Sequence, residues 1–167
     1  MIRQNLIRRQ CLLSIATGRS SPKQVERGII PKPPQTKRED PEHLRPTRPD
    51  QTVILVVDDA VMIRNVARIT LEADGYFILT AHDGEEALHI SREFPGTIHA
   101  VLSDLMMPKM DGLELRERIL KQRPGVRVLL MSGYVGAAVP FDVAFLKKPF
   151  GPAVLKDRIR ELLASAQ

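Results

Sequence analysis

VILVVDD, residues 53–59, is a run of five apolar residues that ends in two acids. Four of the five are β-branched, and a continuous run of this kind is typical of a strand covered on both faces, as the strands of parallel sheets are. Because the run stops at Asp58 and Asp59, it brings two carboxylates to the carboxyl end of that strand. The run therefore predicts an α/β fold with charged groups at one edge of its sheet.

Strands and helices alternate after this run. The sequence predicts four more strands, at 76–81, 98–103, 126–131 and 144–147. It predicts helices, from apolar residues that recur every three or four positions, at 63–71, 85–93, 113–122 and 152–164. Short right-handed crossovers join such a chain into an open parallel five-stranded sheet with helices on both faces.

Composition narrows the class of protein. The chain has 167 residues, of which 43% are apolar and 27% charged, a balance typical of a globular domain. No window approaches the roughly 18 consecutive apolar residues of a membrane-spanning helix. The one cysteine, Cys11, excludes an intramolecular disulfide and suits a reducing compartment. We therefore expect a soluble, cytoplasmic protein.

The basic charge is concentrated near the N-terminus. Residues 1–50 hold 11 Lys and Arg against five Asp and Glu, and seven of the 13 prolines. Such a segment buries too little apolar surface to offset chain entropy. The sequence predicts a basic, proline-rich arm at 1–50, without fixed structure, and one folded domain at 51–167. Residues 1–17 fit either a solvated tail or a basic amphipathic helix like an organelle presequence.

Polar side chains gather where the predicted strands end. Asp58 and Asp59 follow the first strand, Asp104 the third, Ser132 the fourth and Lys148 the fifth. Ligands of open parallel sheets bind outside the carboxyl ends of the strands. Three carboxylates brought together repel one another unless a cation intervenes, and Mg²⁺ is the cation that oxygen ligands of this kind favour. The sequence therefore predicts a Mg²⁺ site at this edge.

The same groups fit phosphoryl transfer. The Asp104 carboxylate is a candidate nucleophile that forms an aspartyl-phosphate. The Lys148 ammonium would neutralise phosphoryl oxygens, and the Ser132 hydroxyl would donate a hydrogen bond to one. Taken singly, each residue also fits a structural role, because an Asp pair can cap a helix, Ser-Gly can form a turn and a Lys pair can be solvated. Taken jointly, they favour the phosphoryl site.

The chain resembles the response-regulator receiver domains of bacterial two-component signalling. The resemblance covers residues 51–167 and is carried, in order, by VILVVDDAVMIR, AHDGEEAL, SDLMMPKMDGLEL, MSGY and FLKKPF. It implies a flavodoxin-like fold with strand order 2-1-3-4-5. The C-terminal segments are most similar to receivers of hybrid histidine kinases.

The resemblance also implies roles for individual residues. Asp104 would be the phosphoacceptor, and the Mg²⁺ ligands would be Asp104, Asp59, Asp58 (directly or through water) and the Met106 backbone carbonyl. Ser132 would be the switch hydroxyl and Lys148 the phosphate-binding lysine, before a cis peptide bond to Pro149. Phe145 would be the aromatic side chain that turns inward on phosphorylation. We also expect the bulk of Met106 and Tyr134 to hinder attacking water and prolong the phosphorylated state.

The chain departs from the family in one segment. Only 15 residues separate Ser132 from Lys148, where family members usually fit a whole helix. We expect the fourth helix to be shortened or absent. Since that helix contributes to the usual dimer face, we expect a monomer or a weak dimer.

The first hypothesis for function is a stand-alone receiver that accepts phosphate from a histidine kinase or a histidine phosphotransfer protein and acts through an unknown downstream protein. It would catalyse only its own modification, and so would not be an enzyme on an external substrate. An alternative is a nucleic-acid-binding regulator whose basic arm contacts phosphates, although the arm has no aromatic residue or helix-turn-helix pattern, which makes nucleic acid an unfavoured partner. A hydrolase with an aspartyl-phosphate is weaker, because no second acid stands in a general acid/base position next to Asp104 on its loop.

Overall fold

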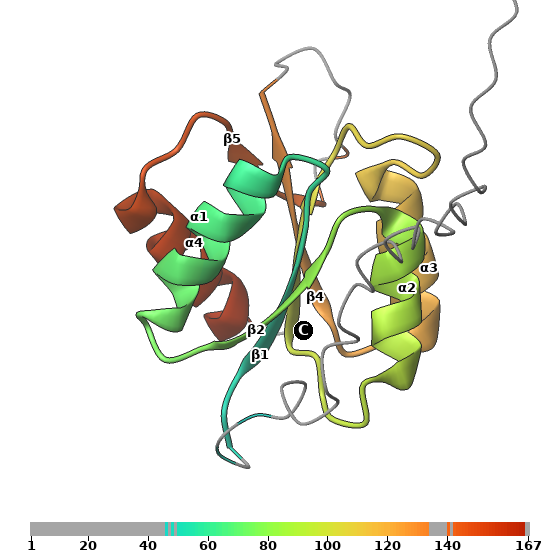
Figure 1. Cartoon of the computed structure of the whole chain (residues 1–167), viewed down its shortest axis with the longest axis horizontal. Helices are drawn as coiled ribbons and strands as arrows, with labels where there is room; N and C mark the ends of the chain where they lie inside the picture. Colours follow the sequence, from blue (N-terminus) through green and yellow to red (C-terminus); the bar gives the residue numbers. More distant parts are fainter. Residues whose placement is uncertain (1–45, 47, 49, 134–139, 141, 166–167) are drawn as a thin grey trace, which may run out of the picture. The chain divides into compact units, whose positions relative to one another are not determined.

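The computed structural model describes residues 46, 48, 50–133, 140 and 142–165, and the predicted arm at 1–50 falls almost wholly outside them. Strands and helices alternate along the described chain (Figure 1). The elements are β1 (Val53–Val57), α1 (Val61–Glu72), β2 (Phe77–Ala81), α2 (Gly84–Glu93), β3 (Ala100–Asp104), α3 (Gly112–Gln122), β4 (Arg127–Ser132), β5 (Ala144–Lys147) and α4 (Pro152–Ala164).

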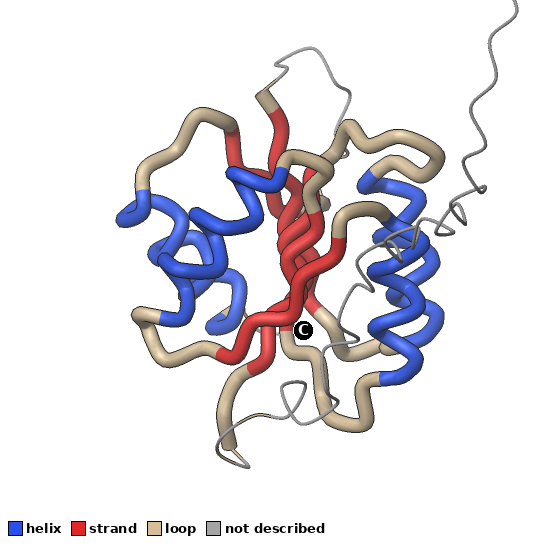
Figure 2. The backbone as a smooth tube through the Cα atoms, viewed as in Figure 1, coloured by secondary structure: helices blue, strands red, loops and turns tan. Residues whose placement is uncertain are grey.

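The five strands form one parallel sheet in the order β2-β1-β3-β4-β5, which confirms the predicted flavodoxin-like fold. The sheet lies between two layers of helices (Figure 2). Helices α1 and α4 cover one face, and α2 and α3 cover the other (Figure 1). The register pairs Val57 with Ala81 and with Ser103, and Asp104 with Met131. The carboxyl ends of the strands therefore reach one edge of the sheet together.

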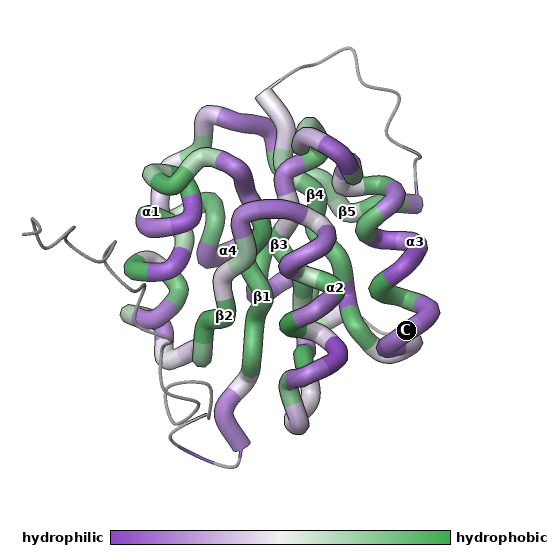
Figure 3. Tube along the Cα trace, turned by 45° about the vertical axis from the view of Figure 1, so that its right-hand side comes forward, coloured by the Kyte–Doolittle hydropathy of each residue, from purple (hydrophilic) through white to green (hydrophobic). Residues whose placement is uncertain are grey.

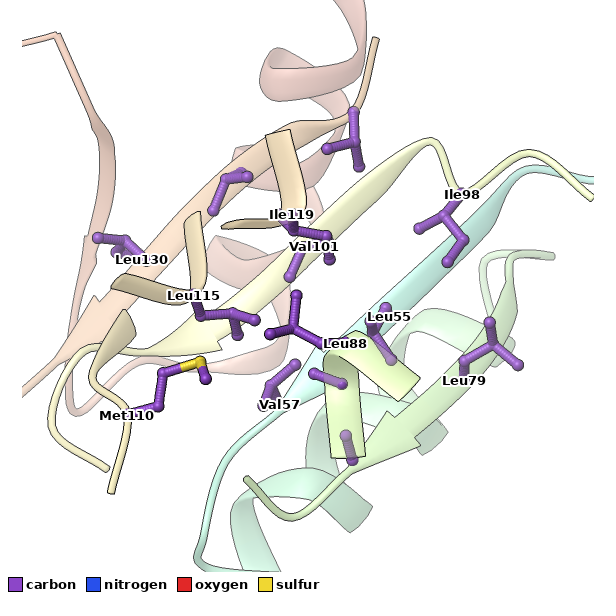
Figure 4. Close-up of a cluster of buried hydrophobic side chains, with 14 of the residues drawn as sticks. Leu55, Val57, Leu79, Leu88, Ile98, Val101, Met110, Leu115, Ile119 and Leu130 are labelled. Carbon is purple, nitrogen blue, oxygen red and sulfur yellow. The ribbon is translucent and has the colours of Figure 1, made fainter. Parts of the chain in front are cut away.

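Alternate residues of the strands supply two separate cores. Leu55 and Val57 face α2 and α3, whereas Ile54 and Val56 face α1 and α4, and all four are fully buried. The strands are accordingly mostly hydrophobic, whereas hydrophobic and hydrophilic residues alternate along the helices (Figure 3). On the first face, Leu88, Leu115 and Ile119 reach down from the helices onto the sheet (Figure 4). Each side chain buried in this way contributes about 1.5–3 kcal/mol of hydrophobic free energy.

The third strand begins two residues later than the sequence predicts. Ile98 is buried in the core without belonging to β3, so its apolar character reflects packing and not strand pairing. His99, before the strand, bonds to Val53 at the start of β1. Its backbone N–H donates to the Val53 carbonyl, and its ring Nδ1 accepts the Val53 N–H at 3.0 Å. The imidazole thus replaces a backbone partner at the beginning of the sheet.

The described part of the chain contains four helices, and none of its residues between β4 and β5 belongs to a helix. This agrees with the predicted shortening or loss of the helix at that point, although residues 134–139 and 141 are not described. No helix among the described residues is long and apolar enough to cross a membrane.

Candidate functional site

Three carboxylates come together at the carboxyl end of the sheet. Asp58 and Asp59 follow β1 directly, and Asp104 is the last residue of the adjacent strand β3. Each of the three offers an oxygen atom, and these atoms lie within 4.8 Å of one another. Neighbouring parallel strands that end at the same level produce this arrangement, because the sheet register fixes where the residue after each strand lies.

A single lysine lies against two of these acids. The Lys148 ammonium is 2.6 Å from Asp58 Oδ2 and 3.1 Å from Asp104 Oδ1. Lys148 follows β5, and its backbone N–H donates to the Ser132 carbonyl at 2.8 Å. The Lys148–Pro149 peptide bond is cis, as the resemblance implies. Among the three acids and this lysine, negative charges exceed positive ones.

Burial and the crowding of charges perturb the titration of both partners. Burial raises the pKa of Asp104 above its usual value, and the nearby Asp58 charge adds to this, while the hydrogen bond from Lys148 opposes it. For Lys148, burial acts to lower the pKa, but the hydrogen bonds and charges of Asp58 and Asp104 outweigh it and raise the pKa. Lys148 is therefore a cation at neutral pH, and the Asp104 carboxylate is costly to ionise.

The two adjacent acids Asp58 and Asp59 have different environments. Asp58 is buried, and its two oxygens accept from the Ala60 N–H, at 2.9 Å, and from Lys148. Asp59 is exposed, and in the described part of the chain its carboxylate has no ion-pair partner. The three acids supply only oxygen, and one of them is open to solvent. This donor set fits Mg²⁺, which binds through one or two carboxylates and keeps several waters.

The loop after Asp104 folds closely around it. Asp104 Oδ1 accepts the Leu105 N–H at 3.0 Å, and the Gly112 N–H donates to the Leu105 carbonyl at 2.9 Å. A Cβ atom on Gly112 would lie 2.4 Å from the Asp104 carbonyl oxygen, so this approach requires glycine. Met106 lies in this loop with 64% of its surface exposed.

The other predicted site residues lie at the same edge or next to it. Ser132 ends β4 and is buried, one residue beyond the strand partner of Asp104. Phe145 lies in β5, half-buried, and packs against the core on the α2–α3 face. Tyr134 lies outside the described residues. The roles of Ser132, Phe145, Met106 and Tyr134 stay predictions.

Two contacts near the site were not predicted from the sequence. The Arg64 guanidinium of α1 donates to the backbone carbonyls of Asp58 and Asp59. Lys109, a non-glycine residue with a positive φ of 68°, extends from the β3–α3 loop to Asp83 at the start of α2, with Nζ 3.2 Å from Oδ2. A cation within the first turn of a helix, where acids are favoured, is the signal that points to Arg64.

An apolar surface borders the site. Four large apolar residues of α1 are exposed, namely Val61, Met62, Val66 and Ile69. Beside them is a cavity of about 350 Å³ that α1 shares with the segment after β5, lined by Ile63, Val66, Gly133, Lys148, Pro149 and Phe150. An exposed apolar patch next to a polar site is typical of a surface that binds another protein.

Comparison with known proteins gives one consistent result. The family model described as response regulator receiver domain matches residues 54–160. A sensor kinase CckA from Brucella abortus (strain 2308) is 38% identical over 119 residues, which are 67% of this chain and 12% of that protein. A probable transcriptional regulator ycf27 from Guillardia theta is 34% identical over 116 residues, 66% of this chain and 44% of that protein. The chain thus spans less than half the length of these relatives.

Solved structures are similar over the same region. The receiver domain of a hybrid histidine kinase CckA has a TM-score of 0.59 and 39% identity, covering 66% of this chain and 98% of that structure. The chemotaxis protein CheY4 of Vibrio cholerae has a TM-score of 0.61 and 27% identity, covering 68% of this chain and 99% of that structure. In both, nearly the whole of the compared structure matches, and about a third of this chain has no counterpart.

Proposed function

The chain belongs to the response regulator receiver domain family, and from this membership we propose that it is a Mg²⁺-dependent switch phosphorylated on Asp104. One observation carries the proposal. Lys148 and Asp58, which are 90 residues apart in the sequence, meet at Asp104 together with the exposed carboxylate of Asp59. A strand-end acid, a buried ammonium and an oxygen-only donor set are the groups that phosphoryl transfer to a carboxylate needs.

The phosphoryl group comes from a phosphohistidine of a histidine kinase or a histidine phosphotransfer protein. Asp104 Oδ1 already accepts from Leu105 and Lys148, so we assign the attack to Oδ2. A P–O bond forms to this oxygen while the P–N bond of the donor breaks, and its electron pair passes to the imidazole nitrogen. Water later reverses the modification by breaking the acyl phosphate, which releases inorganic phosphate.

The surrounding residues bind and orient the phosphoryl group. The Lys148 ammonium neutralises one of its oxygens, and the Ser132 hydroxyl donates to another. Asp58, Asp59, Asp104 and the Met106 carbonyl would hold Mg²⁺. When bound, the ion neutralises charge on the acids and the phosphoryl oxygens. Phe145 then turns inward as the hydroxyl of Ser132 engages the phosphoryl group.

The protein modifies only itself, and a downstream protein carries its signal. It catalyses only its own phosphorylation and dephosphorylation, and the downstream protein remains to be identified. The exposed apolar residues of α1 beside the Lys148–Phe150 segment support a protein as phosphodonor, because a small donor needs no such surface. The nucleic-acid alternative depends on residues 1–50, and no observation in the described part of the chain favours it. The cytoplasmic location also stays a prediction.

Mass spectrometry of the intact protein tests the proposal. Wild type incubated with acetyl phosphate and Mg²⁺ is expected to gain one phosphoryl group, and Asp104→Asn none, because an amide is not a competent nucleophile here. Asp111→Asn is the matched control, since Asp111 lies in the same loop but caps α3. Equal phosphorylation of wild type and Asp104→Asn, or loss of phosphorylation only in Asp111→Asn, would reject Asp104 as the acceptor.

A further inference from the structure

The turn between β1 and α1 carries two of the three acids, and an arginine holds its backbone. Arg64 Nη1 donates to the carbonyl oxygen of Asp58 and, at 3.1 Å, to that of Asp59. Arg64 is half-buried and lies in the first turn of α1, so its guanidinium extends back over the start of its own helix. One planar cation thus bonds to two consecutive peptide groups of the turn.

Helix formation does not explain an arginine at this place. The N-terminus of a helix carries partial positive charge, so a cation there is unfavourable and an acid is favourable. Helices α2 and α3 follow that rule, since each begins at an aspartate whose side chain accepts a backbone N–H, and each has glutamate in its first turn. Helix α1 has neither a side-chain cap nor an acid in its first turn. Helix α4 also lacks both, but only α1 has an arginine that donates to the two carbonyl oxygens before its start, among the described helices.

We infer that Arg64 is a positioning residue that fixes the β1–α1 turn so that the Asp59 carboxylate is presented to the metal. The inference rests on the proposed function, because it assumes that the acids bind Mg²⁺. It concerns Asp59 more than Asp58. Asp58 is held by its own side chain, through the Ala60 N–H and Lys148. Asp59 has no such anchor in the described structure, so its direction follows from the backbone that Arg64 holds.

The charge of Arg64 and its contacts with the turn predict opposite changes in Mg²⁺ affinity when Arg64 is replaced. As a nearby cation, its guanidinium repels Mg²⁺, so loss of the charge alone would tighten binding of the ion. If Arg64 orders the turn, it favours Mg²⁺ binding, and its loss would weaken the affinity for Mg²⁺. The sign of the change in Mg²⁺ affinity therefore distinguishes the two roles.

Isothermal titration calorimetry with MgCl₂ provides the test. Arg64→Met is expected to bind Mg²⁺ about tenfold more weakly than wild type, the usual size of the effect when a residue that orients a ligand is removed. Arg64→Lys keeps the charge, but its shorter side chain places the ammonium differently from Nη1, which makes both bonds. Its Mg²⁺ affinity is expected to lie between those of wild type and Arg64→Met. Arg68→Met is the matched control, because Arg68 is on the same helix and its charge pairs with Glu72. This control is expected to bind Mg²⁺ as tightly as wild type or slightly more tightly.

A second measurement separates positioning from a general loss of structure. Circular dichroism and thermal unfolding in EDTA establish that each variant is folded before the titration. In an Asp59→Asn background, Arg64→Met is expected to cause no further loss of Mg²⁺ affinity, because the two residues act through one ligand. An additional tenfold loss in that background would overturn the assignment of Arg64 to Asp59.

The outcomes for the inference and for the proposed function differ. Wild type that binds no Mg²⁺ overturns both. Wild type that binds the ion, with Arg64→Met binding it equally or more tightly, overturns the inference and leaves the proposed function standing. If Arg64→Met does not fold, Arg64→Lys decides the matter, since an affinity equal to that of wild type would also overturn the inference.

Discussion

Two charged clusters lie near opposite ends of α1, and they differ in their balance of charge. At its start is the site cluster of Asp58, Asp59, Asp104 and Lys148, in which acids outnumber the single cation. Beyond its end, Asp74 is bound by Lys156 and Arg160 of α4, each with a nitrogen 2.6 Å from a carboxylate oxygen. We call this second group the Asp74 cluster. Because Arg160 also pairs with Asp157 at 3.0 Å, its two cations are balanced by two acids.

The pKa values of the two acids move in opposite directions. The hydrogen bond from Lys156 lowers the pKa of Asp74, and the charges of Lys156 and Arg160 add to this against a smaller effect of burial. Burial raises the pKa of Asp104 despite its lysine partner. The comparison shows two outcomes for an ion cluster. The Asp74 cluster has enough positive charge, and it only joins α1 to α4. The site cluster is short of positive charge, so it favours binding of a further cation at a cost in stability.

Magnesium should have the largest effect, and only on the site cluster. At about 100 times its dissociation constant, Mg²⁺ is expected to stabilise the native wild type by about 2.7 kcal/mol, because it binds the folded state alone. Asp59→Asn should lose most of this stabilisation, whereas Asp74→Asn should keep it. Thermal unfolding of the three proteins in EDTA and in a MgCl₂ series measures the effect. An equal response from both variants would show that the ion does not distinguish the clusters.

Removing the charge of Asp104, the proposed phosphoacceptor, should stabilise the metal-free protein. The raised pKa of Asp104 means that wild type loses stability as pH rises through that pKa, because the ionised carboxylate is favoured in the unfolded chain. At pH 7 in EDTA, Asp104→Asn is therefore expected to be more stable than wild type by about 1 kcal/mol, the usual size of a stabilising single substitution.

The gain from Asp104→Asn should disappear below the ordinary carboxyl pKa of 3.8, where the wild-type group is protonated in both states. Urea unfolding at a series of pH values checks both points. A variant less stable than wild type at pH 7 would mean that the pairing with Lys148 outweighs the cost of burial.

The smallest effect is expected at the Asp74 cluster, and with the opposite sign. The lowered pKa of Asp74 contributes stability that is present above the ordinary carboxyl pKa and is lost as pH falls through the lowered pKa. Asp74→Asn should thus be slightly less stable than wild type at pH 7, and the two should converge in acid. The same urea series measures this, and a difference that grows on acidification would contradict the sign.

The sequence allowed most of the fold and the main acids of the site to be predicted. An apolar run that stops at a polar residue marks the carboxyl end of a parallel strand. Four such strand ends identified Asp58, Asp59, Asp104, Ser132 and Lys148 without any knowledge of contacts. The rule succeeds because sheet register, and not side-chain detail, brings these positions to one edge.

Contacts made through the backbone could not be predicted in this way. Arg64 binds two carbonyl oxygens, and the His99 ring accepts an N–H, so neither partner is marked by a residue type in the sequence. The late start of β3 could not be predicted for a similar reason. Ile98 is buried by core packing and not by strand pairing, and a pattern of apolar residues does not distinguish the two. The close approach of Gly112 to Asp104 likewise depends on loop geometry.

Lys148 lies between Asp58 and Asp104 and partly balances their charge from within the chain. Many small metal-binding domains remain unfolded until their ion arrives, because the free energy of metal binding drives their folding. Here Lys148 offsets part of the carboxylate repulsion without a metal ion, so we expect a newly synthesised molecule to fold in a magnesium-poor environment. Under the proposed function, the ion would then serve phosphorylation and not folding.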